Sequence, residues 1–321
     1  MNACLPVVSV IMNCRNSSQF LREAIDSVFN QTFTDWEIIF WDNASSDASP
    51  DIAQSYTKGE HDRRLRYFRA EEPTPLGAAR NLAIAEARGR YIAFLDCDDL
   101  WLPEKLADQV ALLETNPKVG LACTDTVLFS GRRELNRMFR MAPPKRGFAL
   151  RELMSAGWIA MSAAMIRKSA LDGLGGPDDW FDPDFSMAEE ADLFYRLAWN
   201  WELDHVDLPL TRWRVHAQNT TFKKFHQFAD ETRLILDKYT RLHPEFPERY
   251  PDLVELLQRR AAFQKAVALW RDGQNRAARA EIAPFPASMK FRLFRLATYL
   301  PGACFDVLAR AYYALPQFLR K

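Results

Sequence analysis

The sequence of 321 residues predicts an α/β fold with a mainly parallel sheet, helices on both faces of that sheet, and a helical C-terminal extension. Two observations lead to this prediction. Short apolar runs alternate with amphipathic segments over residues 1–222, a pattern typical of a parallel sheet that is covered on both faces. Over residues 223–321 the strand pattern disappears and helical spacing continues. We therefore expect one large domain over 1–222 and a helical extension over 223–321.

The first hundred residues predict strands that alternate with helices. The expected strands cover 7–12, 37–41, 65–68 and 91–95, and the expected helices cover 20–29 and 76–87. In sheets of this kind ligands bind outside the C-terminal ends of the strands. We therefore expect the polar loops 13–16, 42–47 and 96–99 to line one crevice.

The second half of the large domain has a less regular pattern. The expected helices cover 102–113 and 189–199, the expected strands cover 119–123, 162–166, 203–206 and 211–215, and a turn-rich loop covers 173–184. Pro103 suits the first turn of a helix, because its missing N–H would have no partner there.

Composition limits the class of protein. The 42 basic and 42 acidic side chains balance, which argues against a nucleic-acid partner. The five cysteines are scattered and lack metal-binding spacing, so we expect reduced thiols in a cytoplasmic protein. No basic leader precedes the first apolar run, and no apolar stretch reaches the roughly 18 residues of a membrane span.

Three carboxylates, those of Asp96, Asp98 and Asp99, directly follow the strand over 91–95. Crowded carboxylates raise each other's pKa unless a cation lies among them. Oxygen ligands in such a cluster suit Mg²⁺ or Mn²⁺, which also bind substrate phosphates. The spacing indicates a divalent ion between the protein and a nucleotide diphosphate, although an exposed acidic turn has the same pattern.

Two further positions offer contacts to a nucleotide. Asp42 ends a strand and can accept the imide N–H of uracil, whereas Asn43, Ser45 and Asp47 fit helix capping. Arg80 lies near the start of a helix, where free N–H groups favour phosphate. Taken alone, Arg80 also fits an ordinary exposed arginine.

The last two candidates lie late in the domain. Glu189 and Glu190 open a helix, so the helix dipole alone explains them; a general base is the functional interpretation. Arg214 and His216 end a strand and can bring a cation and an imidazole to phosphates or metal. A hydrogen-bonded structural histidine is the alternative.

Taken together, the residues resemble glycosyltransferase family 2 in four blocks: VSVIMNCRNSSQFLREAIDSVFNQTFTDWEIIFWDNASSD, LGAARNLAIAEARGRYIAFLDCDDLW, AEEADLFYRLAW and WRVH. The resemblance covers roughly residues 5–220. It implies the Rossmann-like GT-A fold, with a nucleotide-sugar half over about 1–100 and an acceptor half over about 101–222. It also implies a nucleotide-diphosphate sugar donor with UDP favoured, Mn²⁺ or Mg²⁺ as cofactor, and inversion of the anomeric centre.

The resemblance also implies roles for individual residues. Asp42 would hold the nucleobase, Asp96 and Asp98 would form the D-x-D motif, and Glu190 would be the catalytic base. The metal would be held by Asp98 and Asp96, with His216 beside them. The expected nucleotide-sugar contacts are Asn13, Arg15, Asn16, Asp42, Arg80, Asn81, Asp96, Cys97 and Asp98. The acceptor candidates are Trp101, Trp158, Trp180 and Glu189, although the tryptophans fit core packing equally well.

The chain departs from the family pattern in three places. The first loop reads Asn-Cys-Arg-Asn over 13–16 and lacks the aromatic residue expected beneath the base. Glu190 replaces an aspartate and lengthens the reach of the base by one methylene, which alters the donor–acceptor geometry. The Q-x-x-R-W motif of processive members is missing from the sequence, which favours addition of a single sugar.

These inferences predict a glycosyltransferase of bacterial cell-surface polysaccharide or lipopolysaccharide synthesis, with a glycan or lipid-linked glycan acceptor. The tail over 289–321 holds six basic residues against one acidic residue, with apolar residues from Phe305 to Leu319 at heptad-like spacing. It fits a peripheral contact with the cytoplasmic face of the inner membrane. A helix packed on the catalytic domain or on a second subunit fits equally well.

Two other functions compete with glycosyl transfer. A sugar-nucleotide pyrophosphorylase needs a glycine-rich basic loop after the first strand, and residues 13–18 are neither. A degenerate scaffold that only binds nucleotide is disfavoured by the intact Asp96 and Asp98 but favoured by Glu190. A dehydrogenase is excluded because no G-x-G-x-x-G follows any strand.

Overall fold

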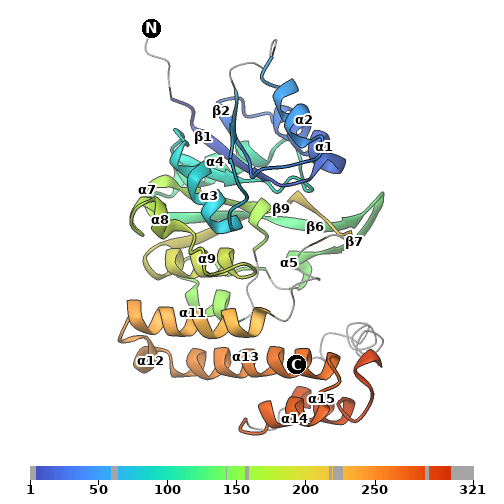
Figure 1. Cartoon of the computed structure of the whole chain (residues 1–321). Coiled ribbons are helices and arrows are strands. Elements are labelled where there is room, and N and C mark those ends of the chain that lie inside the picture. Colours follow the sequence, from blue (N-terminus) through green and yellow to red (C-terminus); the bar gives the residue numbers. More distant parts are fainter. Residues whose placement is uncertain are drawn as a thin grey trace. The chain divides into compact units, whose positions relative to one another are not determined.

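The computed structural model describes residues 5–58, 64–141, 143–155, 159–216, 219, 227–285 and 289–304 of the chain (Figure 1). The chain divides between Asn219 and Thr220 into two compact units. The N-terminal unit carries the sheet and every residue predicted to bind donor, metal or acceptor. The C-terminal unit is helical.

The first four strands of the sheet are parallel, as predicted. They are β1 (Val8–Cys14), β2 (Trp36–Asp42), β3 (Leu65–Arg69) and β4 (Tyr91–Phe94), in the spatial order β3-β2-β1-β4. Val8 pairs with both Trp36 and Tyr91, and Cys14 at the end of β1 pairs with Asp42. The polar loops that follow β1, β2 and β4 therefore emerge at the same edge of the sheet.

The second half of the sheet is mixed. The remaining strands are β5 (Leu100–Trp101), β6 (Val119–Ser130), β7 (Arg133–Arg137), β8 (Ala164–Arg167) and β9 (Glu202–Arg214). Strand β8 is antiparallel to β4 and β6, β5 is antiparallel to β9, β7 is antiparallel to β6, and only β9 is parallel to β6. The sheet order continues from β4 as β8-β6-β9-β5.

Helices cover both faces of the sheet. On one face α1 (Ser18–Phe29), α2 (Ser49–Ser55) and α4 (Lys105–Thr115) share a core with Val8, Val10 and Met12 of β1. On the other face α3 (Leu76–Ala85) packs on β1 and β2, and α9 (Glu189–Asn200) packs on β6. Alternate residues of a strand face opposite sides, so buried Ile11 lies on the α3 side. The shorter helices are α5 (Met138–Met141), α6 (Leu150–Ser155), η2 (Met161–Ala163), α7 (Lys168–Asp172) and α8 (Pro177–Trp180).

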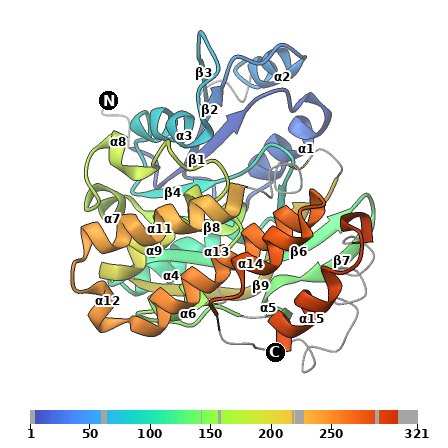
Figure 2. The same ribbon diagram turned by 60° about the horizontal axis from the view of Figure 1, so that its bottom comes forward.

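The C-terminal unit consists of helices in its described part. They are α11 (Phe228–Leu242), α12 (Phe246–Arg249), α13 (Pro251–Arg271), α14 (Asn275–Glu281), α15 (Met289–Ala297) and η4 (Gly302–Cys304). Helix α13 packs along α11 and α14 (Figure 2). Trp270, Phe291 and Phe294 lie in the core of this unit. Among the described helices none combines the length and apolarity needed to cross a membrane.

Candidate functional site

The loops after β1 and β2 are bonded to each other. The Asn16 N–H donates to Ser45 Oγ at 3.0 Å, and the Ser46 N–H donates to Asn16 Oδ1 at 2.8 Å. Asn16 has a φ of 55° and Ala44 a φ of 57°, so both loops turn through left-handed backbone. Arg15 is exposed beside them. These two predicted loops therefore form one wall of the site.

Asp47 caps helices, as predicted. Its carboxylate accepts the N–H of Ser18 at 3.0 Å and the N–H of Ser49 at 2.9 Å, and these residues begin α1 and α2. Although desolvation acts in the opposite direction, the hydrogen bonds from Ser49 and Ser18 lower the pKa of Asp47 to about 2.

Asp42 is fully buried, at 0 % exposure. Its Oδ1 accepts the Ser45 N–H at 2.9 Å, its Oδ2 accepts the Tyr67 hydroxyl at 2.7 Å, and Arg69 Nη1 lies 3.4 Å from the same Oδ2. Here the carboxylate stabilises the loop after β2. A base contact, as predicted for Asp42, requires Tyr67 or Arg69 to move away.

Residues 96–99, which we call the acidic turn, follow β4. The Asp99 N–H donates to the Asp96 carbonyl at 3.0 Å, and this bond closes the turn. The side chains of Asp96 and Asp98 are 43 % and 30 % exposed, whereas Asp99 is only 1 % exposed. Cys97 is buried and donates its S–H to the Asn13 carbonyl at 3.3 Å, so its side chain faces the protein, not a ligand. Of the three aspartates of the acidic turn, only Asp96 and Asp98 present carboxylates to the site.

Asp98 and His216 form the part of the site that suits a metal ion. His216 Nε2 lies 2.9 Å from Asp98 Oδ2, and 22 % of the imidazole side chain is exposed. Within the described ranges no three His, Cys, Asp or Glu side chains converge on one point. Mg²⁺ and similar ions are usually bound by one or two carboxylates plus substrate phosphates. The pair therefore fits a divalent ion whose coordination a diphosphate would complete.

Arg80 is buried between carboxylates. Its predicted role was a contact with phosphate. Its Nη1 lies 2.8 Å from Glu189 Oε1, its Nη2 lies 3.4 Å from Asp96 Oδ1, and its guanidinium lies 5.3 Å from the centre of the Phe181 ring. Glu189 is 4 % exposed and forms an internal ion pair here, so a contact with an acceptor, as predicted, requires this pair to open. Burying two opposite charges is tolerated because each compensates the other.

Asn81 makes a structural contact, and its predicted role at the nucleotide stays a prediction. Its Nδ2 donates to the Phe181 carbonyl at 2.7 Å, and its Oδ1 accepts the Phe181 N–H at 2.8 Å. The amide thus fastens the 173–184 loop to α3. Asn13 behaves differently: its Nδ2 is buried and meets no acceptor among the described residues.

Glu190 lies half-buried in the first turn of α9. Burial and the negative charge of Glu189 raise its pKa to about 8, while Arg80 acts in the opposite direction. A carboxyl group that titrates near neutral pH can accept a proton from a hydroxyl and release it afterwards. Of the acidic residues at the start of α9, Asp192 is instead paired with Arg196 at 2.7 Å, as predicted.

The tryptophans proposed to stack on an acceptor belong to the core. Trp101 is 3 % exposed and its indole N–H donates to the Ser162 carbonyl at 2.7 Å; Trp180 is 4 % exposed. Large aromatic rings gain most by burial, and here that gain outweighs any gain from exposure at the site. Neither ring is open in this structure to stack on an acceptor, and the acceptor assignment stays a prediction. Trp158 lies outside the described residues.

Three residues hold the acidic turn in place. Ser162 was not expected at the site, whereas Asp99 was one of the three predicted carboxylates and Arg214 was a candidate cation for phosphates or metal. Asp99, Ser162 and Arg214 bond to one another and to the backbone of the turn. Burial and the charges of Asp98 and Asp96 raise the pKa of Asp99 well above its usual range. The signal in the sequence was the third aspartate directly after the D-x-D motif.

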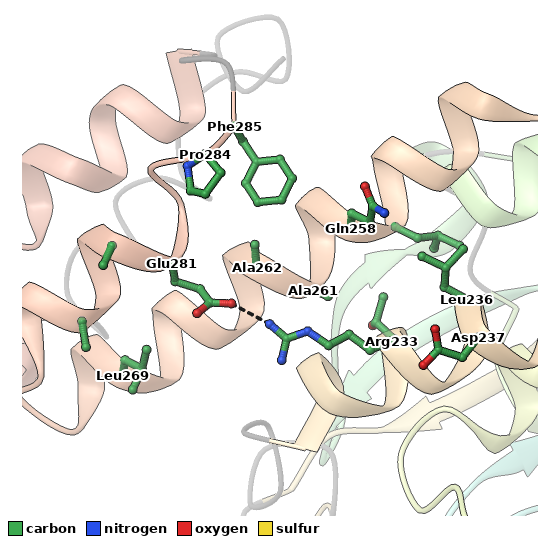
Figure 3. Close-up of a pocket in the computed structure, with 14 residues that line it drawn as sticks. Arg233, Leu236, Asp237, Gln258, Ala261, Ala262, Leu269, Glu281, Pro284 and Phe285 are labelled. Carbon is green, nitrogen blue, oxygen red and sulfur yellow. Dashed lines mark hydrogen bonds and ion pairs between the residues drawn. The ribbon is translucent and has the colours of Figure 1, made fainter. Parts of the chain in front are cut away.

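A cavity of about 720 Å³ lies within the C-terminal unit. It is lined by residues of α11, α13, α14 and the segment that follows α14 (Figure 3). Arg233 of α11 reaches across it to Glu281 of α14, and Leu236, Ala261 and Phe285 make much of its wall apolar (Figure 3). It contains none of the predicted donor, metal or acceptor residues.

Comparison with known proteins gives a family match and several relatives. The family described as Glycosyl transferase family 2 matches residues 9–175. TuaG of Bacillus subtilis (strain 168), whose name assigns it to teichuronic acid biosynthesis as a glycosyltransferase, is 39% identical over 108 residues, which are 34% of this chain and 42% of TuaG. Chondroitin synthase of Escherichia coli is 25% identical over 241 residues, 74% of this chain and 33% of the synthase. The matches span less than half of the length of these relatives.

Two solved structures share the fold of this chain. Residues 1–349 of S. aureus TarS in complex with UDP superpose with a TM-score of 0.62 at 19% identity and cover 86% of this chain and 87% of that one. The mannosyltransferase PcManGT from Pyrobaculum calidifontis, in complex with GDP-Man and Mn²⁺, gives a TM-score of 0.62 at 20% identity, over 99% of this chain and 83% of that one. The predicted GT-A fold with a helical C-terminal extension is confirmed.

Proposed function

The chain belongs to glycosyl transferase family 2, and we propose that it moves a sugar from a nucleotide-diphosphate sugar to an acceptor hydroxyl with inversion. One observation supports this most strongly: the acidic turn joins two groups of side chains with different chemistry. Asp98 meets His216 at 2.9 Å, whereas Asp96 approaches Arg80 at 3.4 Å, on the side where Glu190 lies. A site for the leaving diphosphate thus adjoins a candidate base.

The donor side of the site is proposed to bind a UDP-sugar. TarS was solved with UDP and with UDP-GlcNAc, whereas PcManGT was solved with GDP-Man. Asp98, with His216 and Asp96 near it, would hold Mn²⁺ or Mg²⁺, and a bound ion would offset the charge of the departing diphosphate. Exposed Arg15 would contact the phosphates, and Asn13 would use its buried Nδ2–H.

Glu190 is proposed to take the proton of the acceptor hydroxyl as that oxygen attacks the anomeric carbon. A pKa of about 8 keeps its proton affinity close to the working pH, which general-base catalysis requires. Glu189 and Arg80 would act indirectly. Their buried ion pair holds the start of α9 against α3 and so positions Glu190.

The acceptor is proposed to be a glycan or lipid-linked glycan of the bacterial cell surface. The name of TuaG refers to teichuronic acid biosynthesis, and this supports a polymer of sugars as the class of product. We place the reaction on the cytoplasmic side of the inner membrane, where nucleotide-sugars are made. Addition of one sugar per acceptor is proposed because a processivity motif is missing from the sequence.

Helix α15 and the residues after it offer a surface for anionic lipid. Leu293, Leu296, Tyr299 and Leu300 are exposed, at 46 %, 67 %, 73 % and 45 %. The sequence from 289 to 304 contains three basic residues and no acidic one. An exposed apolar stripe with basic neighbours is typical of helices that lie in a membrane interface. The rest of the predicted tail, 305–321, lies outside the described residues.

Purified full-length protein tests the proposed activity. It should release UDP from one member of a panel of UDP-sugars, faster with Mn²⁺ than with EDTA, and Asp98→Ala should remove the metal effect. Nucleotide binding without release of UDP, even with extracts of bacterial glycolipids as acceptors, would indicate a scaffold. Production of UDP-sugar from UTP and a sugar phosphate would indicate a pyrophosphorylase.

A further inference from the structure

We propose that Asp99 is a positioning residue that holds the Asp98–His216 pair in register for metal and diphosphate, an inference that rests on the proposed function. Asp98 and His216 come from different segments, the acidic turn and the residues after β9, and their side chains meet at 2.9 Å. Something must fix these two segments relative to each other. The side chain that does so is the third carboxylate of the acidic turn.

Asp99 bonds to two segments outside its own turn. Its Oδ1 accepts the backbone N–H of Arg214, the last residue of β9, at 2.9 Å. Its Oδ2 accepts the hydroxyl of Ser162, in η2, at 2.6 Å. Ser162 Oγ in turn accepts the Asp96 N–H at 3.1 Å. One carboxyl group therefore connects the acidic turn, η2 and the end of β9.

The side chain of Arg214 in turn bonds to the acidic turn. Its Nε donates to the Asp98 carbonyl at 2.7 Å, and its Nη2 pairs with Glu23 of α1 at 2.9 Å. The guanidinium also lies over the rings of Phe20 and Phe129, at 4.3 Å and 4.7 Å. Because Arg214 is two residues before His216, this clamp fixes the position from which the imidazole reaches Asp98.

Asp99 is unsuited to binding a metal or substrate itself. It is 1 % exposed, Ser162 is 0 % exposed, and both carboxyl oxygens already have partners inside the protein. Removal of a residue that orients metal ligands without binding the metal itself typically lowers metal affinity or activity by about 10- to 100-fold. Arg214 is also a positioning residue, because its guanidinium bonds to the Asp98 carbonyl and the Glu23 carboxylate and not to a phosphate.

Asp125 provides a matched control. It is a buried aspartate at 0 % exposure on β6, and its carboxylate accepts the N–H of Phe139 at 2.9 Å and pairs with Arg137. Asp125→Ala therefore removes a buried carboxylate of equal size from the same unit of the chain. It should lower stability, as Asp99→Ala should, without loosening the acidic turn.

The experiment compares Asp99→Ala, Asp99→Asn and Asp125→Ala in the full-length protein by amide hydrogen exchange and by Mn²⁺ titration of UDP release. We expect Asp99→Ala to speed exchange at Arg214 and Asp96 and to raise the half-saturating Mn²⁺ concentration by about 10-fold or more. Asp99→Asn should restore part of both, because an amide oxygen can still accept the Arg214 N–H. Asp125→Ala should speed exchange at Phe139 and leave the Mn²⁺ requirement unchanged.

The two readouts separate this inference from the proposed function. If the wild-type protein releases no UDP, the proposed function fails, and exchange at Arg214 and Asp96 still decides whether Asp99 is the clamp. Unchanged exchange at both amides in folded Asp99→Ala would overturn the clamp, as would an unchanged Mn²⁺ requirement in an active enzyme. If Asp99→Ala does not fold, Ser162→Ala replaces it. Because the Arg214 N–H keeps its acceptor in that variant, faster exchange at Arg214 supports the clamp, and wild-type exchange there overturns it.

Discussion

At the scale of single residues, substitution of Glu190 tests the proposed mechanism most directly. Glu190→Gln keeps the size and the hydrogen-bonding shape of the side chain but removes its ability to accept a proton. We expect the turnover number to fall by about two to four orders of magnitude while the affinity for the UDP-sugar is retained. Steady-state kinetics with a calorimetric measurement of donor binding would check this. Near-normal turnover would assign the base to another residue.

The pKa of Glu190 gives a second prediction, for pH dependence. The base must be deprotonated to act, so kcat/KM should rise as pH increases towards about 8 and level off above it. The folded state holds this proton more tightly than the unfolded chain does. Its contribution to stability is therefore present below the ordinary glutamate pKa and is lost as pH rises through about 8. Glu190→Gln should remove this loss, which thermal unfolding at several pH values would show.

Asp42 is where sequence and structure suggest different roles, and one pair of variants separates them. Asp42→Ala leaves the Ser45 N–H and the Tyr67 hydroxyl without their acceptor, so we expect a loss of about 1–3 kcal/mol in stability. Tyr67→Phe removes one of these internal bonds and leaves the carboxylate. If Asp42 also binds the base, only Asp42→Ala should weaken UDP binding, by about tenfold or more. Equal UDP affinity in both variants would show that Asp42 only stabilises the loop after β2.

Residue chemistry could be predicted from the sequence where it depends on position along a strand. Asp96 and Asp98 lie at a strand end, as their place after an apolar run indicates. The partners of Arg80 could not be predicted, because Glu189 is 109 residues away and the pair forms only through the fold. Trp101 shows the same limit: its ring is equally suited to core and cleft, and its neighbours in three dimensions decide.

At the scale of elements, local periodicity predicted the first four strands and the helices α1, α3 and α4 closely, but it missed α2 and the short strand β5. It was less accurate for β9, which is one strand over Glu202–Arg214 where two were expected. Polar Asp207 and Pro209 interrupt the apolar pattern, but the backbone continues because a register shift between Thr124 and Thr126 of β6 absorbs them. Long-range pairing of this kind leaves little trace in a single strand's sequence.

Helix α15 shows why deletion is a poor test of the lipid surface. Phe291 and Phe294 belong to the core of the C-terminal unit, and the Trp270 indole donates to the Leu300 carbonyl at 2.9 Å. Removing 289–321 would therefore open this core. Variants of the exposed side chains alone avoid that difficulty.

We expect the double variant Leu293→Glu, Leu296→Glu to lose binding to vesicles that contain anionic phospholipid while its folding is retained. Both side chains are exposed, at 46 % and 67 %, so the change removes apolar contact with lipid and adds charge that the lipid repels. Leu242→Glu is the control, since Leu242 is also exposed, at 52 %, on α11. Vesicle co-sedimentation at low and high salt measures the effect. Equal sedimentation of both variants would show that α15 does not contact the membrane.

At the scale of the whole molecule, the order of α/β and helical parts follows from the sequence because each part has its own period. The mixed second half of the sheet does not follow from it. Continuous apolar runs such as 119–123 and 162–166 are compatible with either direction of pairing, and β8 is antiparallel to both of its neighbours. The direction of each strand depends on how the segments between strands connect them, and the sequence of a single strand does not contain this information.

Ligand binding should couple to the stability of the whole catalytic unit through Asp98. If the ion and the diphosphate share that carboxylate, UDP with Mn²⁺ should raise the melting temperature more than the sum of the two separate effects. A ligand at 100 times its dissociation constant adds about 2.7 kcal/mol to the stability of the folded state. Asp98→Ala should abolish the Mn²⁺-dependent part of the gain, and His216→Ala should reduce it. UDP alone should still stabilise both variants, because its base is proposed to bind at the loops after β1 and β2 and not at Asp98. A full Mn²⁺-dependent gain in Asp98→Ala would place the ion elsewhere.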